Sequence, residues 1–328
     1  MVESSPVVSP VVSPVVNGAA AYDWKGSAGV LERYGSILKM AIAPRNSKLA
    51  EDPTYWQIFS FYVCHSVLVV LYLLLFCYRL YNFSANKLKL RFLNLTYNPS
   101  RSPSLIRNDV GKLAKIPRQI AAILNCRAEE EENGGVDGLL NDSSELAAWC
   151  VSSGIPNLAI YERTGTMKHH IPELRRAVFR KLTAYFGTGN VPSYSIRVPH
   201  LNLTFYGASD EYEKSNSKPA IEISLLSLED GRNTIVEMTR VMAELAKTGE
   251  LDEKKVTLKF IDDELKQLVG AEPDLIVMFQ PYIDLQGFPP WHIRLSEMYW
   301  EPDNDDVTYA VYLRSLQKFS TCKVNVGK

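Results

Sequence analysis

Residues 272–300 read EPDLIVMFQPYIDLQGFPPWHIRLSEMYW. Near its start, residues 275–279 form an apolar run that follows Asp274 and ends shortly before Pro281. A short, wholly apolar run between turn-forming residues is typical of a strand that is buried on both faces, as in a parallel sheet. This stretch therefore predicts one central strand followed by a long connection.

Three similar runs lie upstream, at residues 116–124, 158–161 and 220–228. Two helical stripes lie between these runs. Apolar residues recur every three or four positions from Ile171 to a stop at Gly187, and from Ile235 to a stop at Gly249. Alternating strands and helices predict the α/β class, with a mostly parallel sheet that helices flank on both faces.

The chain upstream of this domain has a different composition. No Asp, Glu, Lys or Arg occurs between Pro53 and Tyr78, and about 20 apolar residues suffice for one transmembrane helix. A buried core helix is the alternative. The flanks of this stretch each hold four basic residues, so charge does not decide its orientation. We predict a disordered segment at 1–52 that contains PVVSPVVSPVV, a transmembrane helix at 53–80, a linker at 81–104 and the α/β domain at 105–328.

The overall composition excludes some partners. A net charge of −1 over 328 residues gives no basic footprint for nucleic acid. The five cysteines include no CxxC pair and show no zinc spacing, so we expect neither a disulfide framework nor a structural zinc. A reducing compartment fits this usage.

Paired carboxylates are the first candidates for chemistry. Asp262 with Asp263, and Asp305 with Asp306, could bind a metal, but neither pair has a further aspartate three residues on. We expect Asp305 and Asp306 to cap a helix N-terminus.

An acidic run and a histidine pair are the remaining candidates. Residues 129–132 are four consecutive glutamates before Asn133, which predicts a solvated loop rather than a metal site. His169 and His170 would point in different directions at a helix start, so we expect no shared metal.

Four segments together resemble the cis-prenyltransferase family, and most closely its non-catalytic branch, the Nogo-B receptor and its fungal counterparts. In catalytic members the first strand ends in Met-Asp-Gly-Asn, whose Asp binds magnesium. The matching run IPRQIAAILNCRAEEEE places Asn125 at the Asp position and Cys126 at the Gly position. By this resemblance, both the metal ligand and the turn that admits a diphosphate are lost.

The second and third segments retain only part of the family pattern. NLAIYERTGTMKHH resembles the second strand at Tyr161 and Lys168 but lacks its Glu-Asn pair. LLSLEDGRNTIVEM keeps Gly231 and Arg232, and we expect this arginine to be structural.

Residues 272–300 align without a gap on the family's isopentenyl-diphosphate site. The resemblance places Met278 and Asp284 at the two arginine positions and Gln286 at the serine position. Bidentate guanidinium contacts hold diphosphates strongly, so their loss removes the site. The scaffold after it matches the family's helix at the dimer interface, at Trp291, Ile293, Glu297 and Tyr299.

The last residues read TCKVNVGK, in which Asn325-Val326-Gly327 resembles the Asn-x-Gly end of fungal members. In the family such a tail crosses to the partner and touches its isopentenyl diphosphate. Glycine lets backbone N–H groups approach phosphate oxygens, and asparagine adds a neutral donor. The resemblance thus implies that Asn325 and Gly327 bind substrate in trans.

Taken together, the resemblance implies an accessory subunit of the dehydrodolichyl diphosphate synthase complex. It would be inactive alone, with no catalytic residue and no metal of its own. A catalytic partner would bind Mg²⁺ and condense isopentenyl diphosphate onto farnesyl diphosphate for dolichol synthesis and protein glycosylation. The resemblance also implies a single-pass protein of the endoplasmic reticulum membrane whose C-terminal domain is cytosolic. Two alternatives remain, a membrane receptor or scaffold with an inert domain and a self-sufficient homodimeric enzyme.

Overall fold

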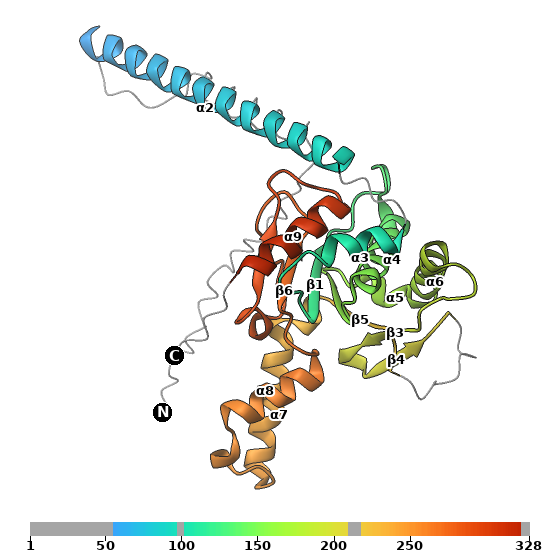
Figure 1. The fold of residues 1–328 in the computed structure, drawn as a ribbon. Helices are drawn as coiled ribbons and strands as arrows, with labels where there is room; N and C mark the ends of the chain where they lie inside the picture. Colours follow the sequence, from blue (N-terminus) through green and yellow to red (C-terminus); the bar gives the residue numbers. More distant parts are fainter. Residues whose placement is uncertain (1–54, 97–101, 209–217, 323–328) are drawn as a thin grey trace, which may run out of the picture. The chain divides into compact units, whose positions relative to one another are not determined.

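The computed structural model describes residues 55–96, 102–208 and 218–322 (Figure 1). The chain divides into two compact units, Met1–Asn82 and Phe83–Lys328. The predicted disordered segment at 1–52, like Asn325 and Gly327, lies outside the described residues.

A seven-stranded sheet forms the centre of the second unit, in the order β4-β3-β5-β2-β1-β6-β7 (Figure 1). Every neighbouring pair is parallel except β3 and β4. This arrangement confirms the predicted α/β class with a mostly parallel sheet. The strands are β1 (Gln119–Leu124), β2 (Asn157–Glu162), β3 (Tyr194–Val198), β4 (Leu203–Tyr206), β5 (Ile221–Leu226), β6 (Leu275–Met278) and β7 (Glu297–Trp300).

The two faces of the sheet bury different sets of residues, because successive side chains of a strand point to opposite faces. Ile120, Ala122 and Leu124 of β1 join the large core, whereas Ala121 and Ile123 join a smaller cluster. Four helices cover the large core, and Val269 and Phe288 close part of the smaller cluster. The four helices are α3 (Pro103–Val110), α4 (Gly135–Ser153), α6 (Ile171–Phe186) and α9 (Tyr309–Thr321).

The predicted helical stripes are confirmed, with their stops. Helix α6 ends before Gly187, and α7 (Arg232–Thr248) ends before Gly249, whose φ of 79° is left-handed. The remaining helix of more than one turn is α8 (Leu258–Leu268). The short elements are α5 (Thr166–His169) and four 3-10 turns, η1 (Pro199–Leu201), η2 (Leu228–Asp230), η3 (Glu253–Lys255) and η4 (Pro290–Ile293).

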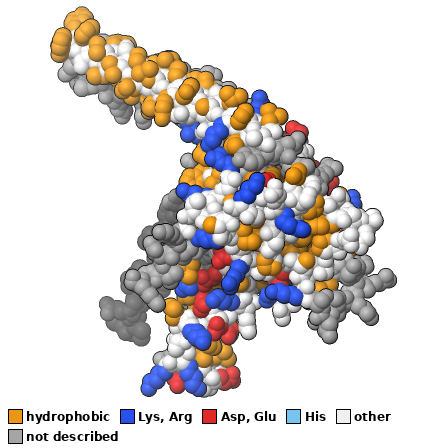
Figure 2. All heavy atoms as spheres, in the orientation of Figure 1, with side chains coloured by type: hydrophobic (Ala, Val, Ile, Leu, Met, Phe, Trp, Pro, Cys, Tyr) orange, Lys and Arg blue, Asp and Glu red, His pale blue; other side chains and the backbone are white. Residues whose placement is uncertain are grey.

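Helix α2 (Tyr55–Thr96) contains the predicted membrane segment. By length and composition, residues 59–96 are the one described segment able to cross a membrane, and they expose apolar side chains along their length (Figure 2). The helix does not end with the apolar stretch. It continues through residues 81–96, where the sequence predicts part of a linker. The second compact unit begins at Phe83, upstream of the predicted domain start at residue 105.

Polar contacts make the end of α2 part of the second unit. Lys87 pairs with Asp305 at 3.2 Å, Lys89 pairs with Glu301 at 2.8 Å, and Leu90 is buried. Our prediction that Asp305 caps a helix is therefore wrong. Helix α9 begins only at Tyr309, after Thr308.

Glu301 joins three elements of this unit. Its carboxylate, 5% exposed, accepts hydrogen bonds from Lys89 of α2, Tyr299 of β7 at 2.6 Å, and Arg314 of α9 at 3.0 Å. Burial favours the protonated form, but these donors outweigh burial and hold the pKa of Glu301 below its usual range.

We expect Glu301→Gln to destabilise the chain by about 2 kcal/mol at pH 7, because three donors lose a charged acceptor. The folded-state pKa lies below the unfolded-state value of about 4.3. The contribution is therefore present above that pH and is lost as the pH falls through the folded-state pKa. Thermal denaturation at pH 7 and pH 4 checks this, with exposed Glu250→Gln as control. An equal deficit at both pH values would contradict it.

Candidate functional site

The carboxyl ends of β1 and β6 mark the point where the chain changes direction across the sheet. The chain passes from β1 to β2 on one side, and β6 later pairs with the other side of β1. Open α/β sheets bind their ligands beside such a switch point. Asn125 follows β1 directly and Met278 ends β6, so both predicted positions lie there.

A network of side-chain amides occupies this position. The Nε2 of Gln286 donates to the Oδ1 of Asn125 and, over 2.8 Å, to the Oε1 of Gln280. Gln280 in turn donates to the backbone oxygen of Asp284, whose carboxylate accepts the backbone N–H of Gln286 at 2.8 Å. Three positions that the resemblance matches to metal-binding and diphosphate-binding residues, Asn125, Asp284 and Gln286, thus lie together and are linked by hydrogen bonds.

The connection that carries Gln286 also lies tightly against β2 and the start of α7. Tyr161 donates its hydroxyl hydrogen to the backbone oxygen of Gln286 at 2.7 Å. The backbone oxygen of Gly287 approaches Gly231 so closely that a Cβ there would lie 2.4 Å from it. Gly231 is therefore needed for this close approach, and Tyr161 is a structural donor.

The other two altered positions, Met278 and Cys126, take no part in this amide network; the Sγ of Cys126 lies 3.9 Å from the backbone oxygen of Arg127. Met278 is fully buried and belongs to the smaller cluster, beside Ile123 in the sheet. The side chain of Cys126 is exposed. Partial burial and the charges of Glu162 and Glu129 raise the pKa of its thiol, so it stays protonated at neutral pH.

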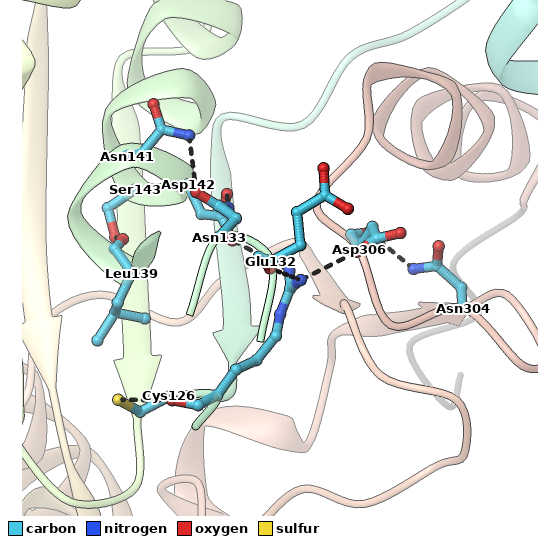
Figure 3. A network of polar contacts seen from close by, with 10 residues as sticks. Cys126, Glu132, Asn133, Leu139, Asn141, Asp142, Ser143, Asn304 and Asp306 are labelled. Carbon is cyan, nitrogen blue, oxygen red and sulfur yellow. Dashed lines mark hydrogen bonds and ion pairs between the residues drawn. The ribbon is translucent and has the colours of Figure 1, made fainter. Parts of the chain in front are cut away.

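Arg127, the cationic residue next to Cys126, already has carboxylate partners. Arg127 pairs with Asp306 at 3.0 Å and with Asp142 at 3.5 Å, and donates to the backbone oxygen of Glu132 (Figure 3). Burial raises the pKa of Asp142 to about 6, although Asn133 and Arg127 oppose that rise. Asp306, like Asp305, is an ion-pair partner and not a helix cap.

Two cationic residues match the family pattern, Lys168 on α5 and Arg232 at the start of α7, and they differ in their contacts. Lys168 pairs with the buried Asp230 at 2.5 Å and donates to Ser227 at 2.8 Å. Arg232 is exposed at the first residue of α7, and the described chain gives it no hydrogen bond or ion pair. Our expectation of a structural role for Arg232 finds no contact to support it.

The residues present do not fit a magnesium ion. The amide oxygen of Asn125 already accepts a hydrogen bond, and no group of three His, Cys, Asp or Glu that could hold a metal occurs in the described ranges. The four glutamates at 129–132 are exposed, as predicted. His169 ends α5, whereas His170 precedes α6 and contacts the backbone oxygen of Thr166.

The predicted interface residues lie on different elements from those expected. Trp291 and Ile293 belong to η4, and Glu297 begins β7, so the predicted interface helix is wrong: this segment is a 3-10 turn followed by an edge strand. The prolines at 289 and 290 explain the short turn, because proline cannot continue a helix hydrogen-bond ladder. Trp291 donates to Asp262 at 2.8 Å and lies under Arg294.

Asp262 is consequently structural rather than catalytic. Hydrogen bonds from Lys266 and Trp291 lower the pKa of its carboxyl to about 2. Asp263, next to it on α8, is exposed.

One apolar surface was not recognised as functional from the sequence. Helix α7 buries only Thr234, although Ile235, Met238, Met242 and Leu245 repeat at coiled-coil spacing. Val241 and Leu245 expose 53% and 36% of their surface. The period was visible in the sequence, but only the structure shows that little of this chain covers it.

Comparison with known proteins identifies the family of this chain. No family model matches it. It is 47% identical over 273 residues to the dehydrodolichyl diphosphate synthase complex subunit NUS1 of Saccharomyces cerevisiae, covering 80% of this chain and 73% of that protein. The corresponding Schizosaccharomyces pombe subunit is 36% identical, over 72% of this chain and 86% of that protein.

More distant similarities follow. The human subunit is 24% identical, over 68% of this chain and 70% of that protein. A solved structure of lavandulyl diphosphate synthase from Lavandula x intermedia is 16% identical with a TM-score of 0.48, over 65% of this chain and 99% of that one. On its identity to the two yeast proteins, the chain belongs to the NUS1 family, the Nogo-B receptor family of dehydrodolichyl diphosphate synthase complex subunits.

Proposed function

We propose that this chain is the non-catalytic subunit of a cis-prenyltransferase, and that it anchors, stabilises and completes a catalytic partner. Family membership makes it an accessory subunit of the dehydrodolichyl diphosphate synthase complex, which implies such a partner. The observation that supports the lack of catalytic activity is the hydrogen bond between Gln286 and Asn125. By the resemblance, catalytic relatives bind magnesium and diphosphate with the residues at these two positions.

The partner would supply all the chemistry of the condensation. It would bind Mg²⁺, hold farnesyl diphosphate and isopentenyl diphosphate, and accommodate the growing polyprenyl chain used for dolichol. This chain would hold the complex at the endoplasmic reticulum membrane through α2, with its second unit in the cytosol. One long apolar helix is consistent with that single span.

Two described surfaces suit the partner. The first is the η4–β7 segment with Trp291, Ile293 and Glu297, since β7 is the last strand at its edge of the sheet. The second is the set of exposed apolar side chains on α7, Val236, Val241 and Leu245. Apolar side chains left in solvent are typical of protein–protein contacts.

The tail would act on the partner's substrate. Asn325 and Gly327 would offer neutral donors to the isopentenyl diphosphate bound in the partner, where preorganised donors stabilise developing charge. A receptor or scaffold would have no use for such a tail, so the tail separates the two functions.

We expect the purified chain to show no condensation with Mg²⁺, farnesyl diphosphate and isopentenyl diphosphate. Asn125→Asp should restore nothing, because Met278 and Asp284 still occupy the arginine positions. Radiolabelled isopentenyl diphosphate incorporation checks both. Turnover above a no-enzyme control, with other subunits excluded by mass spectrometry, would contradict the proposed lack of catalytic activity.

Trp291→Ala should weaken binding of the catalytic partner by about 2 kcal/mol, or roughly thirtyfold, as is usual for a buried aromatic anchor. Because Trp291 also donates to Asp262, its loss can destabilise the fold. A second variant, Met298→Lys on β7, changes a residue that is 44% exposed and should not affect folding. Leu203→Ala, on the edge strand β4 at the other end of the sheet, is the control and should bind normally. Unchanged affinity in both test variants would remove this segment from the interface.

Deleting the last four residues, 325–328, should leave the complex assembled and lower its turnover by two to three orders of magnitude, about 3 kcal/mol, because donors to the diphosphate are lost. Asn325→Ala should be milder, since backbone donors remain, and Asn325→Arg should be tolerated. Steady-state kinetics of the copurified complex checks this. Full turnover at normal stoichiometry would favour the scaffold function.

A further inference from the structure

Helix α9 forms a rigid base immediately before the tail. Eight of its 13 residues are buried, including Tyr309, Leu316 and Phe319. Tyr312 is fully buried, packs against Trp149 with the ring planes tilted by 43°, and donates to Ser153 at 3.0 Å. The body of this helix therefore cannot move without disrupting the large core.

The last turn of α9 depends on a residue from a distant part of the chain. The ammonium group of Lys115, in the connection between α3 and β1, donates to the backbone oxygen of Cys322 at 2.5 Å. It also lies 4.6 Å from the centre of the Phe319 ring. A cation at this position satisfies a carbonyl that the helix leaves unpaired and complements the negative end of the helix dipole.

The contact fixes the place from which the tail starts. At Cys322 the backbone leaves the helix in an extended conformation, with φ −71° and ψ 138°. Asn325 is three residues further along, so it can lie no more than about 11 Å from the Cα of Cys322. A fixed Cys322 thus confines the reach of Asn325 to a small volume.

We propose that Lys115 is a positioning residue for the C-terminal tail. The inference rests on the proposed action of that tail on the partner's isopentenyl diphosphate. Lys115 itself contacts no substrate. It keeps the last helical turn closed, so the tail is presented from one point instead of from a frayed end.

The size of the effect follows from chain statistics. If the last turn opens back to Phe319, which stays buried in the core, the free stretch before Asn325 grows from three residues to about six. Effective concentration falls roughly as the −3/2 power of linker length, so the local concentration of Asn325 at its target falls about threefold.

The test uses the full chain copurified with its catalytic subunit. Lys115→Met should lower kcat/KM for isopentenyl diphosphate about threefold, leave KM for farnesyl diphosphate and subunit stoichiometry unchanged, and speed amide hydrogen exchange at residues 320–322. Lys115→Arg, which keeps the cation, should restore normal values. Lys112→Met is the matched control, because Lys112 lies in the same connection and is exposed beside Asp109.

Combination with the tail deletion separates the two proposals. When residues 325–328 are absent, Lys115→Met should cause no further loss, because no tail remains to be positioned. Two outcomes would overturn the role of Lys115 while leaving the tail function intact. One is a further loss of kcat/KM when Lys115→Met is added to the tail deletion. The other is a normal kcat/KM for Lys115→Met although the tail deletion lowers turnover. If the deletion itself leaves turnover intact, the proposed tail function fails and the role of Lys115 fails with it.

Discussion

Strand β1 imposes the constraint on which the second unit depends. It pairs with β2 on one side and β6 on the other, and none of residues 120–124 exposes more than 2% of its surface. Its alternate side chains must therefore fill two different cores, and no charged group can be placed along it without a buried partner. The first position free of this constraint is Asn125, which is exposed, so its side chain can change without disturbing the sheet.

The amide network at that end shows how neighbouring polar side chains satisfy one another. A metal ligand and two guanidinium groups would be charges in need of a counter-ion, whereas Asn125, Gln280 and Gln286 are neutral and satisfy one another. Neutral hydrogen-bonded groups avoid the desolvation cost of unpaired charges. The same hydrogen bonds hold the connection after β6, and Gly231 allows the backbone oxygen of Gly287 to lie against the start of α7.

The sequence predicted those parts of the fold that rest on local pattern. The strands at β1, β2, β5 and β6 were visible as apolar runs, and α6 and α7 were visible from their period and their terminal glycines. Other elements carry no such signal. Strand β7 has mixed polarity because it is an edge strand. The resemblance predicts a helix where the η4 turn stands, but Pro289 and Pro290 prevent a longer helix there. The altered site positions could be named from the resemblance. Their mutual hydrogen bonds could not, because Asn125 and Gln286 are 161 residues apart.

Long-range contacts explain why the second compact unit begins at Phe83, upstream of the predicted domain start at residue 105. Composition changes after the apolar segment, but Asn86, Lys87 and Lys89 bond to a loop more than 200 residues away, and such partners leave no trace in local composition. Glu301 then links Lys89 to Arg314 on α9. The residues that continue the candidate membrane helix are thus part of the same buried ion-pair system that holds the C-terminal helix. Glu301, which accepts hydrogen bonds from Lys89 of α2 and Arg314 of α9, and Lys115, which donates to Cys322 after α9, tie the end of α2 and the C-terminal helix to one core through side-chain contacts.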